Sequence, residues 1–148
     1  NLSVYILDNN DEKEDFVNKI ANDLNLVPFM VNSDIENYYA PLEERIQPMV
    51  ESWLRGFIDA EFIITDSYHG CVFSIMFHKP FVVFENEGRG MARVRSLLEL
   101  LKLQDRIVQL PYGIIVSKRP IDWEGIDKIL EERKGSSISM LTASLKKT

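Results

Sequence analysis

Short apolar runs alternate with longer stretches of helical periodicity along this chain. The runs are rich in β-branched and aromatic residues and end on polar or turn-forming residues, which is typical of strands in a buried sheet. They predict five strands, at residues 2–7, 27–31, 61–66, 81–84 and 106–110. Between the runs, apolar residues recur at spacings of three and four, which is typical of helices with a buried face. This spacing predicts a helix that runs to about Leu24 after a cap at Asn10 or Asp11, and helices at residues 41–57, 69–78, 88–103 and 121–134.

Two of these helices meet residues that interrupt helical structure. Pro48 lies inside the helix expected at 41–57, and because proline has no backbone N–H, we expect a kink or a split there. Gly135-Ser136-Ser137 follows the helix expected at 121–134. We expect this tripeptide to end that helix, and a last helix to follow at 138–147.

Strands and helices are predicted to alternate from the first residues to the last strand. This order predicts an α/β fold, a Rossmann-like parallel sheet with helices on both faces. A length of 148 residues suits a single domain spanning 1–148. In open sheets of this class the ligand lies beyond the carboxyl ends of the strands. Two stretches should therefore be functional, Asp66–Gly70 and Glu85–Arg93.

The turn from Thr65 to Gly70 joins a strand to a helix within a few residues. Ser67 is placed to cap that helix, and the free N–H groups of the first helical turn form a natural anion site. His69 lies near the helix start and could donate a hydrogen bond or act as a general acid. Gly70 permits a ligand or neighbouring chain to approach closely. Capping alone explains Asp66 and Ser67 equally well, and a histidine at a helix start is more often structural than catalytic.

A basic cluster follows the next strand, in a chain whose formal net charge is −6. Arg89, Arg93 and Arg95 fall within seven residues, and Gly88 and Gly90 flank the first of them. Guanidinium groups near a helix start suit a ligand that carries both carboxylate and phosphate, because each can bind two oxygens. The alternative is a solvated helix face, or ion pairs with Glu85 and Glu87.

The amino-acid composition argues against several classes of protein. The acidic balance and a pI near 5.0 argue against a general nucleic-acid binder. The single cysteine, Cys71, excludes a disulfide framework and favours a reducing, cytoplasmic compartment. With His69 and His78 as the only histidines, a structural zinc site is not expected, and no metal is predicted. We expect Cys71 to be buried and inert, and His78 to be solvated. No apolar run is long enough to predict a transmembrane helix.

The same residues resemble the C-terminal region of the polysaccharide pyruvyl transferase family over roughly residues 50–110. The resemblance rests on the run from Ala60 to Ile75, on Trp53-Leu54 before it, and on the motifs Lys79-Pro80-Phe81, Asn86, Arg89-Gly90, Arg93, Ser96-Leu97-Leu98 and Leu103-Gln104-Asp105-Arg106.

This resemblance implies a B-type glycosyltransferase architecture of two Rossmann-like domains, of which the chain would be the C-terminal part. The chain begins on Asn1, and we expect the natural protein to be longer there. The acceptor side would come from that preceding half, so we expect residues 1–148 to be inactive alone. The implied location is cytoplasmic, and peripheral contact with the inner face of the membrane is compatible with it.

The implied reaction transfers the enolpyruvyl carbons of phosphoenolpyruvate to two hydroxyls of a saccharide in polysaccharide or exopolysaccharide biosynthesis. It forms a pyruvate ketal, releases phosphate and needs no cofactor. We expect His69 and Asp66 to be catalytic. We expect the donor to be bound by Ser67, Gly70, Arg89, Gly90 and Arg93. Several family members carry an arginine where this chain has Ser67, which shifts the expected phosphate contacts toward Arg89 and Arg93.

Two other functions remain compatible with the sequence. A nucleotide-sugar-dependent glycosyltransferase or epimerase could use the same fold, although no base-binding signature is visible. A non-catalytic sugar-binding domain could also have kept the fold. The substrates that the protein turns over would separate these possibilities.

Overall fold

The computed structural model describes residues 1–33, 39, 41–86, 90–110 and 119–146. The chain forms two compact units, residues 1–117 and residues 118–148. The first contains the sheet and the predicted site. The second contains a single long helix.

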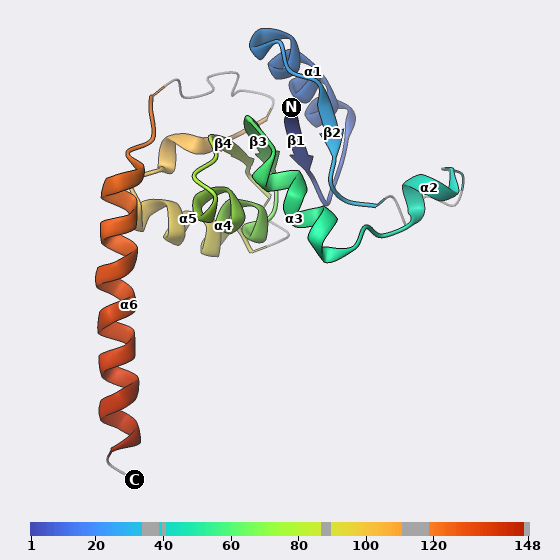
Figure 1. Ribbon diagram of the computed structural model, residues 1–148. Helices are drawn as coiled ribbons and strands as arrows, with labels where there is room; N and C mark the ends of the chain where they lie inside the picture. The colour runs from blue at the N-terminus through green and yellow to red at the C-terminus, as the bar shows by residue number, and fades with distance from the viewer. Residues whose placement is uncertain (34–38, 40, 87–89, 111–118, 147–148) are drawn as a thin grey trace. The chain divides into compact units, whose positions relative to one another are not determined.

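The first unit is built around a five-stranded sheet in which every neighbouring pair of strands is parallel (Figure 1). Its strands are β1 (Leu2–Tyr5), β2 (Pro28–Met30), β3 (Phe62–Thr65), β4 (Phe81–Phe84) and β5 (Ile107–Val108). Their spatial order is β2-β1-β3-β4-β5. The predicted α/β class and all five predicted strands are confirmed.

Among the described residues, five α-helices accompany this sheet, together with a 3-10 turn at Gln104–Arg106. They are α1 (Asp11–Leu24), α2 (Leu42–Arg45), α3 (Val50–Ile58), α4 (Tyr68–Met76) and α5 (Met91–Leu100). The split expected at Pro48 is confirmed, since α2 ends at Arg45 and α3 begins at Val50. A helix cannot run through Pro48 without losing a hydrogen bond and crowding the preceding turn.

Helices cover both faces of the sheet because alternate residues of each strand point to opposite sides. On one face, Phe16 and Ile20 of α1 join a buried apolar cluster with Leu2, Val4 and strand residues further along the sheet. On the other face, Tyr5 stacks edge-on against Trp53 and Phe57 of α3, at centroid distances of 5.4 and 5.7 Å. Trp53 also contacts Phe73 of α4 at 4.9 Å. The strand order reverses after β2, so right-handed crossovers place α1 opposite the later helices.

The second unit consists of α6 (Trp123–Leu145), a continuous helix of 23 residues. The break predicted at Gly135-Ser136-Ser137 was therefore wrong. Ser136 Oγ donates to the carbonyl of Glu132 at 3.0 Å, so this hydroxyl is satisfied inside the helix rather than ending it. Gly135 has open space around it, and one glycine costs a helix only about 1 kcal/mol. Across the described residues, no helix is both long and apolar enough to cross a membrane.

Candidate functional site

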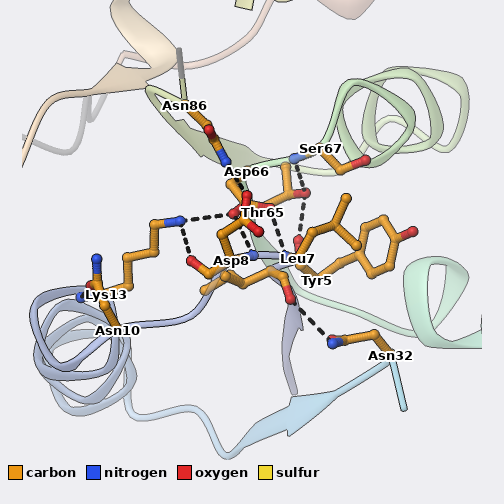
Figure 2. A network of polar contacts seen from close by, with 11 residues as sticks. Tyr5, Leu7, Asp8, Asn10, Lys13, Asn32, Thr65, Asp66, Ser67 and Asn86 are labelled. Atoms are coloured by element: carbon orange, nitrogen blue, oxygen red, sulfur yellow. Dashed lines mark hydrogen bonds and ion pairs between the residues drawn. The ribbon is translucent and has the colours of Figure 1, made fainter. Parts of the chain in front are cut away.

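The predicted site lies at the carboxyl ends of β1, β3 and β4 (Figure 2). The strand order reverses between β1 and β3, and in open α/β sheets such a reversal opens a crevice at the carboxyl edge. Three loops meet there. They are the loop from β1 to α1, the turn from β3 to α4, and the segment that leaves β4.

Asp66 lies at the centre of this edge and its side chain is 0% exposed. Its Oδ1 accepts from the Leu7 amide at 2.7 Å, and its Oδ2 accepts from the Asp8 amide at 3.1 Å. Lys13 Nζ donates to the same Oδ2 at 2.7 Å. Both oxygens of the predicted catalytic carboxylate are therefore bound by the chain itself.

Lys13 was not predicted from the sequence as a site residue. It belongs to the first turn of α1, where its amide donates to Oδ1 of the N-cap residue Asn10 at 2.9 Å. Besides Asp66, its ammonium group donates to the carbonyl of Asp8 at 2.5 Å and lies 5.6 Å from the centre of the Phe84 ring. One weak sequence signal was available. Lys13 falls three residues before Phe16, on the same face of α1 as the buried apolar residues.

Asn86 joins the segment after β4 to this group. Its Nδ2 donates to Oδ2 of Asp8 at 2.7 Å. Asp8 thus receives a bond from the β4 segment while its own amide and carbonyl bind Asp66 and Lys13. Figure 2 shows the side chains of Asp8, Lys13, Asp66 and Asn86 converging from the β1–α1 loop, α1, the β3–α4 turn and the segment after β4.

Ser67 occupies the N-cap position of α4, as predicted, but its side chain makes no capping hydrogen bond. The expectation of a side-chain cap was wrong. Its amide donates to Thr65 Oγ1 at 3.0 Å. Burial raises the pKa of Tyr5 above its ordinary 10.0, the neighbouring Ser67 side chain opposes this rise, and the charge of Asp66 adds to it. The first turn of α4 is consequently not capped by the Ser67 side chain.

His69 is the second residue of α4 and its side chain is exposed. The ring of Tyr68 lies edge-on to it, with the ring centres 5.8 Å apart. The guanidinium carbon of Arg93, in the first turn of α5, lies 5.2 Å from the centre of the same Tyr68 ring. His69 and Arg93 therefore both lie beside the Tyr68 side chain, and their shared role in a donor site stays a prediction. Arg89 lies outside the described residues.

Both predicted glycines are favoured by the local structure, Gly70 by packing and Gly90 by its backbone conformation. A Cβ at Gly70 would stand 2.1 Å from Thr65 Oγ1, so the close neighbour there is a side chain of β3. Gly90 is the N-cap of α5 with φ of 77°, a left-handed conformation that favours glycine. A Cβ at Gly90 would also approach Arg93 Nη2 to 2.7 Å. Gly70 allows α4 to lie close to Thr65 of β3, and Gly90 allows the Arg93 side chain to lie close to the start of α5.

Three other residues are placed as residues outside the site would be. The sequence left this open for Arg95 and predicted it for Cys71 and His78. Arg95 forms an ion pair with Glu85, which confirms the ion-pair alternative for that arginine. Cys71 is fully buried, and burial raises the pKa of its thiol to about 12, as expected of an inert cysteine. His78 is exposed in the turn that ends α4. Among the described residues, no group of three or more His, Cys, Asp or Glu side chains is arranged to hold a metal ion.

The fold and this edge define an α/β domain of Rossmann type whose strand-to-helix turns carry an exposed imidazole and a guanidinium group. The family model described as polysaccharide pyruvyl transferase matches residues 4–88, which is more than half of the chain. The chain belongs to that family. The match reaches further toward the N-terminus than the resemblance at 50–110, so it includes Asp8 and Lys13, and it ends before Arg93. No curated protein and no solved structure matches the chain.

Proposed function

We propose that the protein transfers a pyruvyl group from phosphoenolpyruvate to a saccharide, forming a pyruvate ketal and releasing phosphate. The family supports a transferase of this kind. The observation that carries the proposal is the convergence of His69 and Arg93 on the Tyr68 ring, beside the start of α4.

In this proposal the donor phosphate lies at the amino end of α4. Backbone N–H groups and the helix dipole favour an anion there, and the Ser67 side chain does not occupy them. His69 contacts the same phosphate or protonates the donor. Arg93 binds the carboxylate of the donor through its guanidinium group. A further contact from Arg89 rests on the sequence alone.

The proposed reaction begins with protonation of the methylene carbon of the donor, which makes its C2 oxocarbenium-like. One saccharide hydroxyl adds to C2 and loses its proton. The bond between C2 and the phosphate oxygen then breaks, and the phosphate leaves with the bonding electrons. The second hydroxyl attacks C2 and loses its proton, which closes the ketal. One proton thus ends on the new methyl group and the other on phosphate, with His69 supplying the first and recovering it from a hydroxyl.

Preorganised positive groups lower the barrier because negative charge grows on the phosphate as it leaves. The helix amides and Arg93 belong to different elements, so they hold the two ends of the donor separately. Such positioning makes attack by a bound hydroxyl effectively intramolecular. Asp66 need not touch the donor in this scheme, because its oxygens already bind the Leu7 and Asp8 amides and Lys13.

The test measures phosphate release by the full-length protein from phosphoenolpyruvate, with a panel of saccharides that carry two free hydroxyls on one ring. We expect His69→Ala to lower turnover on the order of 100-fold or more, since it removes a proton donor. His78→Asn is the matched control, because it removes the exposed histidine at the other end of α4 and asparagine tolerates the φ of 51° found there.

Near-normal turnover by His69→Ala would remove His69 from the mechanism. Turnover of nucleotide-sugars in place of phosphoenolpyruvate would show the rival transferase or epimerase. Saccharide binding in calorimetry without turnover of either donor would show a non-catalytic domain.

A further inference from the structure

The buried pair of Lys13 and Asp66 is placed where it contacts three strand ends at once. Lys13 reaches the carbonyl of Asp8 after β1, the carboxylate of Asp66 after β3, and the ring of Phe84 at the end of β4. Asp66 in turn binds two amides of the β1 loop. The side chains are 8% and 0% exposed, so both are almost wholly closed to solvent and to a substrate of ordinary size.

Stability alone does not explain this choice of residues. Removing two charges from water costs about as much as their attraction returns, and apolar replacements of similar volume are often neutral or stabilising. A lysine in the first turn of a helix also opposes the helix dipole, and the rest of this turn is acidic at Asp11, Glu12 and Glu14. Beyond burial, the hydrogen bonds of the pair fix the loop after β1 and the turn after β3 relative to each other.

We infer that Lys13 and Asp66 are positioning residues for the donor site, an inference that rests on the proposed function. Asp66 directly precedes Ser67, the N-cap of the helix that carries His69. Asn86, bound to Asp8, lies in the segment that leads from β4 toward Gly90 and Arg93. The pair therefore sets the distance between the imidazole and the guanidinium group that hold the donor.

The decisive comparison is between Lys13→Met and the double variant Lys13→Met/Asp66→Asn. The single variant leaves a buried carboxylate without its partner, and we expect it to lower both stability and turnover. The double variant has no uncompensated charge. Its amide oxygen can still accept from Leu7, whereas the longer bond from the Asp8 amide is lost because the amide nitrogen cannot accept. We expect its unfolding midpoint to recover toward that of the wild type. Its kcat should stay on the order of 10- to 100-fold below wild type, because small displacements of reacting groups cost that much.

The KM for phosphoenolpyruvate should change less than kcat, since the helix amides that bind phosphate remain in place. Recovery of kcat together with the unfolding midpoint would overturn the inference and leave the pair a structural one. The matched control is Lys19→Met/Asp23→Asn, which makes the same two replacements at exposed positions of α1 and should leave kcat unchanged.

A second variant keeps the inference testable if the double variant does not fold. Asn86→Ala removes the bond to Asp8 without changing any buried charge. We expect a several-fold loss of kcat at an unchanged unfolding midpoint, and full kcat would count against the inference. Wild-type protein that releases no phosphate would instead refute the proposed function, so the two failures are distinguishable.

Discussion

At single positions of the carboxyl edge, packing restricts which side chains can be accommodated as strongly as the proposed chemistry does. Gly70 follows His69 directly, and a side chain there would strike Thr65 of β3. Thr65 itself is held, since its Oγ1 donates to the carbonyl of Tyr5 at 2.7 Å and accepts from the Ser67 amide. Gly70 therefore allows the start of α4 to lie directly on the end of β3.

This contact predicts the effect of Gly70→Ala. The new Cβ would stand 2.1 Å from Thr65 Oγ1, and either the threonine or the helix must shift. Forcing a methyl group into a packed site of this kind costs about 1–3 kcal/mol. Urea unfolding at neutral pH measures the loss. A variant as stable as the wild type would show that α4 moves away from β3 without cost.

The candidate site residues were predictable to different degrees. His69, Gly70, Gly90 and Arg93 follow strand ends in the sequence, so their place at the carboxyl edge could be predicted. The proximity of Ser67 to Tyr5 could not be predicted, because the two residues are 62 positions apart in the sequence and approach each other only across two paired strands. Lys13 was missed for the same reason.

At the scale of elements, helix boundaries followed residue preferences where those preferences were strong. Pro48 divides α2 from α3 as expected. The glycine and serines at 135–137 do not divide α6, because none of them removes a backbone N–H and Ser136 bonds back to Glu132. Asp122 also anchors the start of α6, since its Oδ1 accepts from the Gly125 amide at 3.0 Å.

The continuous helix predicts the effect of Gly135→Ala. Nothing lies within 4 Å of the position of the new Cβ, so the methyl group meets no steric cost. Alanine in a helix interior is favoured over glycine by about 0.8–1.0 kcal/mol. Amide exchange at residues 131–139 should slow by a corresponding few-fold. Faster exchange would contradict a helix that runs unbroken through this segment.

At the scale of the whole molecule, folding buries the thiol of Cys71 and part of the Tyr5 side chain, and burial favours the neutral form of each group. Burial raises the pKa of Cys71 to about 12 from an ordinary 9.0, and it also raises the pKa of Tyr5. The folded protein therefore holds these protons to a higher pH than the unfolded chain. The associated stability is complete below pH 9 and is lost as pH rises toward 12.

We expect the free energy of unfolding to fall between pH 9 and pH 11, with Cys71 contributing up to about 1.4 kcal/mol per pH unit. Urea unfolding at several pH values measures the slope. Cys71→Ala lacks the thiol and should show a shallower slope, whatever its stability at pH 8. Equal slopes for the two proteins would mean that the thiol does not titrate differently on unfolding.

The sequence by itself determined the order of strands and helices, the α/β class and the segments that follow strand ends. These features depend on local periodicity and on turn residues, which a short window of sequence contains. The match to residues 4–88 agrees with the family that those segments resemble.

The tertiary structure decided which groups meet at the carboxyl edge. Asp66 and Lys13 are 53 positions apart in the sequence, and Asn86 and Asp8 are 78 apart. Such pairs form only because β1, β3 and β4 lie side by side, and strand order is a property of the whole sheet. Local patterns therefore located the edge of the site, whereas the global pairing of strands assigned each polar side chain its partner.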